Sequence, residues 1–215
     1  MKIDKTTCWY NKECCKNALE YAKTHPLEKT RHFQVLKSLL EIIIRDNAGK
    51  KLKLLDIGCG ASSLQNTKII KNNFYYTGSD FELMIQDGAT KFNENGNYII
   101  CDIVESTEKE LEFIKSYDVL VMNAFIDVMQ YPIEILTKIL SCGNKYVIIH
   151  RQRTTNDKTY SVTNPSYGGQ TLCSILNQDD FLNVISNHQF IVMQKKNSKV
   201  AEDSYSFLLK KIKLL

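Results

Sequence analysis

The chain has 215 residues, of which 43% are hydrophobic and 24% charged, a composition that excludes a disordered or fibrous protein and predicts one globular domain. No apolar run approaches the ~20 residues of a membrane-crossing helix, and residues 1–20 lack the apolar core of a secretory signal peptide, so we expect a cytoplasmic protein without membrane contact. The net charge of +4 is too small to indicate nucleic-acid binding.

Cysteine and histidine spacing argues against disulfides and metals. The seven cysteines are irregularly spaced and include no CxxC pair, which indicates reduced thiols. The four histidines form neither HxxxH nor HExxH. We therefore predict no metal site.

Residues 1–50 are predicted to be helical. A short helix is expected around residues 18–22, and Pro26 separates it from a longer one. The longer helix is indicated by aliphatic residues that recur on one helix face: Leu36, Leu39, Leu40, Ile43 and Ile44.

From residue 51 the pattern changes to short apolar segments alternating with amphipathic ones. Strands are predicted at residues 51–56, 74–79, 97–101, 117–123 and 145–150, and helices at 62–72, 81–92, 106–116 and 133–140. Strands that are apolar throughout are typical of parallel sheets covered on both faces. The alternation predicts a doubly wound α/β fold with helices on both faces.

The last third of the chain differs. Residues 151–175 show no periodicity and are predicted to be a long loop, followed by a helix at 179–187 and strands at 190–194 and 205–210. Only ten residues separate these two strands, too few for a helical crossover, so they should pair antiparallel. We therefore expect a mostly parallel seven-stranded sheet with an antiparallel final strand.

The most specific motif is the run from Asp56 to Gly60, with the sequence DIGCG, directly after the first predicted strand. Because Gly58 and Gly60 have no side chains, the backbone of this segment can approach a ligand closely. Cys59, between the two glycines, is then expected to lie beside the ligand as well. Because Ser63 stands where a third glycine would complete GxGxxG, and no GxxxxGK[ST] occurs, the motif is neither a full dinucleotide fingerprint nor a P-loop.

Acidic and amide side chains follow the next three strands. Asp80, before Phe81, can accept hydrogen bonds from both hydroxyls of a ribose, and it can also cap the following helix. Asp102 can accept from an exocyclic amine, or act as a turn residue. The cofactor-binding residues predicted from these positions are Phe81, Asp80, Cys101, Asp102, Ile103, Asn123 and Ala124, in addition to Asp56, Gly58, Cys59 and Gly60.

Residues 51–151 resemble the class I S-adenosylmethionine-dependent methyltransferases, with LLDIGCG similar to that family's glycine motif and Asp80 similar to its ribose-binding acid. The antiparallel final strand is also a feature of that family. The resemblance implies residues 1–50 as a helical cap over the active site and 51–215 as one Rossmann-like domain. It implies S-adenosylmethionine as cofactor, with S-adenosylhomocysteine as product. Small stand-alone members of similar appearance accompany surface-polysaccharide synthesis.

Methyl transfer to oxygen needs a general base, and two candidates lie near the predicted crevice. His150 ends the fifth strand and Asp127 follows the fourth. Arg151 and Arg153 should point to one side of an extended segment and form a fork for a phosphate or carboxylate. Together with Tyr160 and Tyr167, they predict a loop that binds the acceptor.

The predicted function is O-methylation of a small polar acceptor such as a sugar, a sugar nucleotide or a polysaccharide precursor. An RNA or protein methyltransferase is an alternative, although residues 123–126 depart from the [ND]PP[FY] motif. A second alternative is an inactive cofactor-binding partner subunit, and a third is an oxidoreductase, which the incomplete GxGxxG disfavours. A homodimer is compatible with all of these.

Overall fold

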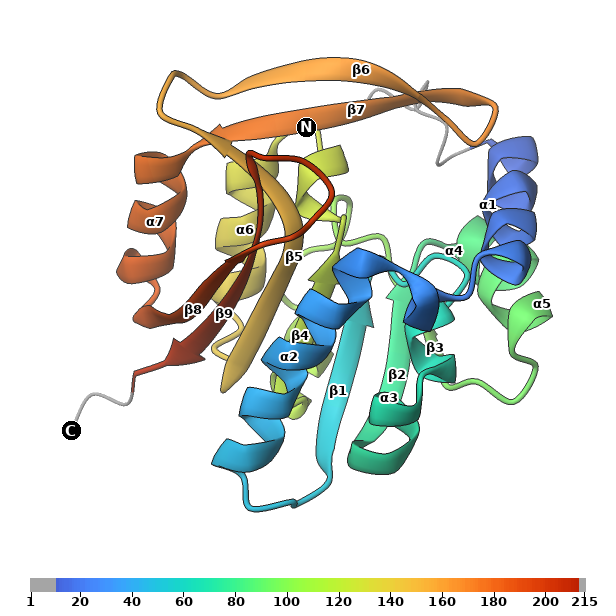
Figure 1. The fold of residues 1–215 in the computed structure, drawn as a ribbon, viewed down its shortest axis with the longest axis horizontal. Helices are drawn as coiled ribbons and strands as arrows, with labels where there is room; N and C mark the ends of the chain where they lie inside the picture. The colour runs from blue at the N-terminus through green and yellow to red at the C-terminus, as the bar shows by residue number, and fades with distance from the viewer. Residues whose placement is uncertain (1–10, 213–215) are drawn as a thin grey trace.

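The computed structural model describes residues 11–212, so the first ten residues of the expected N-terminal extension lie outside the described part. Its strands are joined in one twisted sheet (Figure 1). Their bounds are β1 Leu52–Ile57, β2 Phe74–Asp80, β3 Tyr98–Ile100, β4 Val119–Asn123, β5 Tyr146–Thr155, β6 Tyr160–Ser166, β7 Gly169–Asn177, β8 Phe190–Asn197 and β9 Ser204–Lys211.

Seven of these strands form the central sheet in the order β3-β2-β1-β4-β5-β9-β8. The first five of that order are mutually parallel. Strand β9 runs antiparallel to both β5 and β8. The predicted α/β fold with an antiparallel final strand is therefore confirmed.

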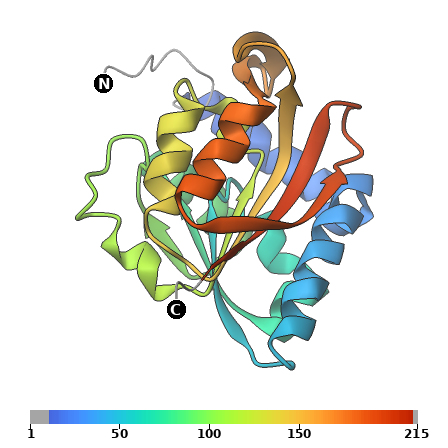
Figure 2. The same ribbon diagram turned by 90° about the vertical axis from the view of Figure 1, so that its left-hand side faces the viewer.

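Helices cover both faces of the sheet (Figure 2: α6 yellow and α7 orange on one side, α2 blue on the other). Buried side chains of α6 and α7 form one core with the sheet, and those of α2 and α3 form the second. The α-helices are α1 Lys12–Thr24, α2 Arg31–Asp46, α3 Lys68–Asn73, α4 Glu82–Met84, α5 Thr90–Phe92, α6 Pro132–Leu140 and α7 Gln178–Asn187. The remaining turns of helix are η2 Leu27–Lys29, η3 Ser63–Asn66, η4 Ile85–Ala89, η5 Glu112–Ser116 and η6 Ile126–Val128.

Strand β4 shows why the central strands are apolar throughout. Val119 and Val121 belong to the core under α2, whereas Leu120 and Met122 belong to the core under α6 and α7. Successive side chains of a strand point to opposite faces of the sheet, and both faces of β4 are buried beneath helices. An uninterrupted apolar run in the sequence therefore indicates a strand at the centre of the sheet.

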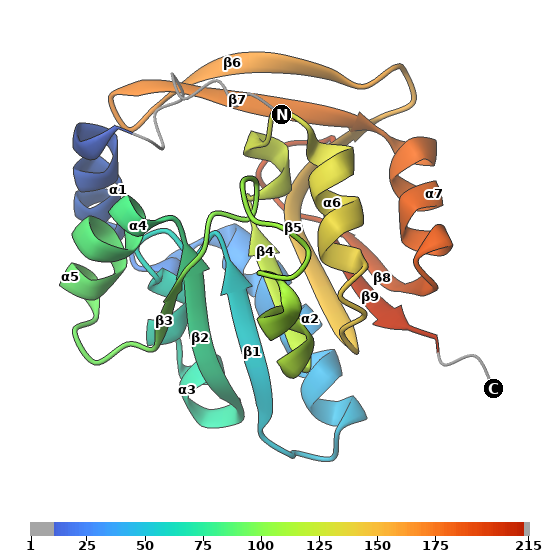
Figure 3. The same ribbon diagram turned by 180° about the vertical axis from the view of Figure 1, so that it is seen from behind.

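The prediction of a loop over residues 151–175 was wrong. Strand β5 continues to Thr155, and β6 and β7 form an antiparallel hairpin that crosses the carboxyl edge of the sheet towards α1 (Figures 1 and 3). Strand β7 also pairs with the end of β5. Most of β6 is exposed, and beyond Tyr160 and Val162 its sequence shows no sustained apolar alternation that would mark a strand.

Three predicted helices are shorter or less regular than expected. The helix predicted at 62–72 is divided into η3 and α3, and a π-helical turn, η4, interrupts that at 81–92. Of the helix predicted at 106–116, only the 3₁₀ helix η5 forms. The side chain of Lys138 bonds to the carbonyl oxygens of Ile103 and Ser106, which occupies backbone acceptors before η5.

The two N-terminal helices have different positions. All of the aliphatic stripe of α2 except Ile44 is fully buried against the sheet, so α2 is a layer of the domain core. Helix α1 lies instead beside the hairpin tip, beyond the sheet edge (Figure 1). No helix among residues 11–212 has the length and hydropathy required to cross a membrane.

Candidate functional site

A cavity of about 980 Å³ lies at the carboxyl ends of the parallel strands, where ligands bind in open α/β sheets. Its floor is formed by the segments that follow β1, β2, β3 and β4. Helix α1 and the β6–β7 hairpin form the opposite wall (Figure 1). All predicted cofactor-binding residues line this cavity.

The glycine turn after β1 is fixed to the end of β2. The amides of Gly58 and Cys59 both donate to the carbonyl oxygen of Ser79, at 2.8 and 3.1 Å. Gly58 and Gly60 have φ values of +68° and +55°, which side chains disfavour. A Cβ at Gly58 would also lie 2.2 Å from Phe125 Cδ2, so the ring of Phe125 packs directly on this turn.

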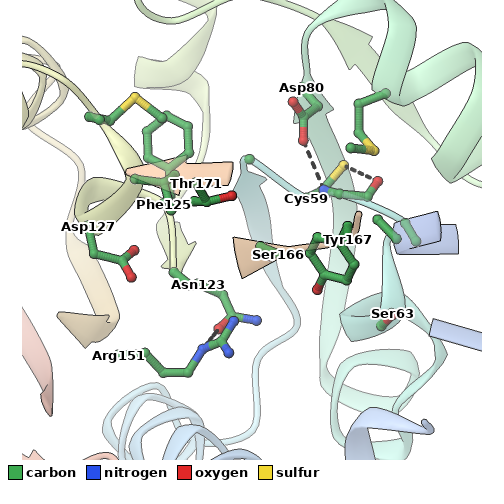
Figure 4. A pocket seen from close by; sticks show the side chains of 18 of the residues that line it. Cys59, Ser63, Asp80, Asn123, Phe125, Asp127, Arg151, Ser166, Tyr167 and Thr171 are labelled. Carbon is green, nitrogen blue, oxygen red and sulfur yellow. Dashed lines mark hydrogen bonds between the residues drawn. The ribbon is translucent and has the colours of Figure 1, made fainter. Parts of the chain in front are cut away.

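Asp80 closes the same turn from the end of β2. Its Oδ2 accepts from the Gly60 amide at 2.9 Å (Figure 4). Its Oδ1 accepts from the Phe81 amide, also at 2.9 Å. Burial raises the pKa of Asp80 to about 6, against the opposing effect of these two hydrogen bonds. Each oxygen keeps a further lone pair for a ligand hydroxyl. The carboxylate thus faces the cavity, where the prediction placed it. It does not cap the following helix, because Phe81 is the N-cap of α4 and no side chain of a described residue caps that helix.

Asp56 lies beneath the turn at the end of β1. Its Oδ2 accepts from the Tyr76 hydroxyl at 2.8 Å, while its Oδ1 is buried and no residue between 11 and 212 bonds to it. Burial raises the pKa of Asp56 to about 7. Ser79 Oγ, at the end of β2, is a second buried polar atom that forms no hydrogen bond within the described part of the chain.

The segment after β3 forms the next part of the floor. The Cys101 amide donates to the Asp80 carbonyl oxygen at 2.9 Å, which continues the parallel pairing beyond the strand. Asp102 Oδ1 accepts from the Val104 amide at 3.0 Å in a local turn, and Ile103 is buried. Asp102 is therefore a turn residue that also lines the cavity.

At the end of β4 the backbone turns sharply at Ala124, which has a φ of +51°. The Ala124 amide donates to the His150 carbonyl oxygen at 2.9 Å. The side chain of Asn123 points into the cavity, and its Oδ1 accepts from Nε of Arg151 at 3.0 Å (Figure 4).

Asp127, on η6, faces the same region of the cavity as Asn123 and Arg151 (Figure 4). Its Oδ1 is buried and has no hydrogen-bond partner among the described residues. Burial raises the pKa of Asp127 to about 6, and the positive charges of Arg151 and Arg153 oppose this rise. A carboxylate with this pKa is ionised at neutral pH and retains affinity for a proton.

His150 does not line the cavity, in contrast to its predicted position. It is 1% exposed, and its Nδ1 lies 2.7 Å from Ser206 Oγ. Its Nε2 lies 3.3 Å from Nδ1 of His32, which does line the cavity. Burial lowers the pKa of both imidazoles, that of His32 to about 4.

His32 is a site residue that sequence reasoning missed. It lies in the first turn of α2, 118 residues from His150, and a lone histidine at a helix start carries no motif. The close packing of α2 on the sheet brings the two imidazoles together. No hydrogen bond to a described residue engages Nε2 of His32.

Arg151 and Arg153 do not form the expected fork. Arg151 adopts a φ of +68° where the pairing of β5 with β9 shifts register between Ile149 and Gln152. This irregularity breaks the alternation of side chains on which the prediction depended. Arg151 faces the cavity, whereas Arg153 does not line it and forms a bidentate ion pair with Asp203.

The two predicted tyrosines are also separated. Tyr160 is 47% exposed and does not line the cavity. Tyr167, at the hairpin tip, lines it, and its carbonyl oxygen accepts from Asn17 Nδ2 at 3.0 Å. The ring of Tyr167 meets that of Tyr21 edge-on, with centroids 5.8 Å apart. These contacts join α1 to the hairpin above the cavity.

Within the described range, no group of three His, Cys, Asp or Glu side chains is arranged to hold a metal ion. No protein-family model matches the chain, and no curated protein matches it significantly. Solved structures, in contrast, match it in large number.

The matching structures include methyltransferases crystallised with S-adenosylmethionine or S-adenosylhomocysteine. A magnesium protoporphyrin IX methyltransferase from Synechocystis matches with a TM-score of 0.59 and 14% identity over 85% of this chain and 80% of its own. An amino pentose methyltransferase from Micromonospora echinaspora matches with a TM-score of 0.59 and 9% identity, over 90% and 96%. A 1,6-didemethyltoxoflavin N1-methyltransferase from Burkholderia thailandensis matches with 0.55 and 14%, over 81% and 77%. The chain therefore has the fold of these methyltransferases.

Proposed function

We propose that this protein is an S-adenosylmethionine-dependent methyltransferase that methylates a hydroxyl of a small polar acceptor, such as a sugar, a sugar nucleotide or a polysaccharide precursor. The observation that carries the proposal is the convergence of the β1 glycine turn and the Asp80 carboxylate on one large cavity. The strand order and the fold shared with methyltransferases support it.

The residues at the cavity fit the cofactor. The cavity volume of about 980 Å³ is at the upper end of the ~300–1,000 Å³ that is usual for small-molecule sites. The cavity therefore has room for an acceptor beside the cofactor. Asp80 would accept the ribose hydroxyls, and the side-chain-free face of Gly60 would adjoin the methionine end, since nothing lies within 4 Å of a Cβ there. The unpartnered Asp56 Oδ1 adds an unused polar atom below the turn. When bound, the cofactor supplies an electrophilic methyl group.

The chain's own residues would orient the acceptor and take its proton. Asp127 has an unpartnered, buried oxygen and a pKa of about 6, which suit a general base. His150 is too deeply buried to touch an acceptor, so we assign it a positioning role through His32. The wall of the cavity formed by α1 and the β6–β7 hairpin would exclude water.

The nature of the acceptor rests on the lining of the cavity. The matching methyltransferases are named for magnesium protoporphyrin IX, an amino pentose and 1,6-didemethyltoxoflavin, so the fold alone does not select among acceptors. Polar side chains gather near the end of β4, including Asn123, Asp127 and Arg151 (Figure 4). They favour a hydroxylated, polar acceptor over an apolar one.

Isothermal titration with S-adenosylmethionine and S-adenosylhomocysteine tests the cofactor. We expect micromolar binding by the wild type and a loss of at least tenfold in Asp80→Ala, because the ribose loses its acceptor. Asp179→Ala, an exposed carboxylate on α7, is the matched control and should bind normally. Absence of binding by the folded wild type would overturn the proposal.

Acceptor turnover separates the alternatives. Methylation of sugars or sugar nucleotides, followed by S-adenosylhomocysteine release, would support the proposed function. Transfer to RNA or protein alone would favour a macromolecular substrate. Cofactor binding without turnover of any of these classes would favour the inactive partner subunit.

A further inference from the structure

Arg151 is a charged side chain at the cavity that has no counter-ion among the described residues. No carboxylate of a described residue lies within 4.0 Å of its guanidinium, and its hydrogen bond goes to the neutral Asn123 Oδ1. Arg153, two residues later, has its charge balanced by Asp203 at 2.6 Å. Of the two arginines, only Arg151 therefore offers an uncompensated positive charge to a ligand.

The backbone holds Arg151 in a strained position. Its φ of +68° is unusual for a residue with a side chain, and it coincides with the irregular pairing of β5 and β9. Such strain persists only where surrounding structure imposes it, and it gathers at ligand sites. The bond from Nε to Asn123 fixes the guanidinium plane, and no residue in the described range bonds to either terminal nitrogen, which can therefore serve a ligand.

The surroundings of the Arg151 guanidinium favour binding of an anion. Burial lowers the pKa of Arg151, so its charged form lacks the solvation that water would supply. Asp127 attracts it across the cavity but lies beyond ion-pair distance. His32 also lines this cavity, and the proximity of Arg151 helps to keep its imidazole neutral.

We propose that Arg151 binds an acidic group of the acceptor, a carboxylate or a phosphate, while Asp127 faces the hydroxyl to be methylated. A guanidinium holds either anion through two parallel hydrogen bonds. The inference rests on the proposed function and narrows it: the acceptor is an acidic hydroxy compound, of the uronate or sugar-phosphate type, and not a neutral sugar.

The cofactor has a carboxylate of its own, which is a second source of the same chemistry. If Arg151 bound that group, its removal would weaken S-adenosylhomocysteine binding. If Arg151 binds the acceptor, its removal would leave that affinity unchanged. The two sources are thus separated by one measurement on the binary complex.

The test uses inorganic phosphate as the anion probe and isothermal titration as the readout, with and without saturating S-adenosylhomocysteine. We expect millimolar phosphate binding by the wild type and at least a tenfold loss in Arg151→Met. Arg151→Lys should retain part of the affinity because it keeps the charge. Arg153→Met is the matched control, since its ion pair with Asp203 lies outside the cavity lining.

Three results would overturn the inference: wild-type protein that does not bind phosphate, equal binding by Arg151→Met, or a tenfold loss of S-adenosylhomocysteine affinity in that variant. Asn123→Leu provides a second variant if Arg151→Met does not fold, and it should weaken phosphate binding by releasing Nε. Phosphate binding without any cofactor binding would overturn the proposed function but leave the anion site intact, so the two failures are distinguishable.

Discussion

Asp127 illustrates how burial prepares a single residue for proton transfer. Its pKa of about 6 places it in the ionised state at neutral pH, and its buried Oδ1 is available to a ligand hydroxyl. Below pH 6 the carboxyl is protonated and cannot accept a proton. Its ionisation therefore links cavity geometry to a measurable pH dependence.

We predict that the rate of methyl transfer rises with pH through about 6 and then levels off. Asp127→Asn should slow transfer by ~10²–10⁴-fold and remove this acid limb, because the amide cannot act as a base. S-adenosylhomocysteine affinity, measured in parallel, should change little. An acid limb that persists in Asp127→Asn would assign the base to another residue.

The two glycines of the β1 turn should differ in their tolerance of a side chain. Both have positive φ, so either alanine variant incurs about 1 kcal/mol of backbone strain. Only Gly58→Ala also drives a methyl group into the Phe125 ring, whereas the space beside Gly60 is open.

We therefore predict a larger loss of unfolding free energy for Gly58→Ala than for Gly60→Ala, by roughly 1–3 kcal/mol. Urea denaturation measures both. Adding Phe125→Leu should recover part of the loss in Gly58→Ala and none in Gly60→Ala. Equal losses in the two single variants would show that the ring yields freely.

The β6–β7 hairpin is the element that encloses the cavity. Its tip contacts α1 through the Asn17–Tyr167 hydrogen bond and the Tyr21–Tyr167 ring contact. The hairpin is attached to the sheet at its base, where the buried Ile175 and Leu176 precede α7. The pairing that attaches the hairpin to β5 therefore lies outside its tip.

Replacing residues 163–172 by an Asn-Gly turn should keep the fold and accelerate S-adenosylhomocysteine dissociation, because the roof of the cavity is lost. Stopped-flow displacement measures the dissociation rate. Asn17→Ala removes only the contact between the tip and α1, and it should change the rate in the same direction by less. An unchanged rate in the truncated protein would show that the hairpin does not retain the ligand.

At the scale of the whole molecule, the buried carboxyl of Asp56 and the buried imidazole of His32 make the free energy of unfolding change with pH in opposite directions. The pKa of Asp56 is raised to about 7, so the folded state binds more protons than the unfolded state between about pH 4 and 7. This contribution to stability is lost as the pH rises. The pKa of His32 is lowered to about 4, so its contribution is lost as the pH falls below about 6.5.

We predict that Asp56→Asn gains stability relative to the wild type as the pH rises from 4 to 8, by on the order of 4 kcal/mol at full effect. The asparagine can still accept the Tyr76 hydrogen bond. His32→Gln should show the opposite slope, gaining on the wild type as the pH falls from 6.5 to 4. Thermal unfolding across this pH range measures both slopes, and parallel curves for wild type and variants would contradict the assigned ionisations.

Local sequence determined the α/β fold, the glycine turn and the carboxylates at the strand ends. Continuous apolar runs mark central parallel strands, and the residues that follow them meet at one edge of the sheet wherever the helices lie. Asp80 and Asn123 could thus be placed at the cavity from their positions after a strand. The positions of Asp80 and Asn123 can be predicted from the sequence of the strand that each of them follows.

Only the tertiary structure decided the acceptor side of the cavity. The polar β6–β7 hairpin is held by pairing with distant residues, and α2 brings His32 to His150 across the chain. A register shift against β9 turns Arg151 into the cavity and leaves Arg153 to Asp203. These features depend on contacts between segments far apart in sequence, whose geometry neither periodicity nor spacing within one segment encodes.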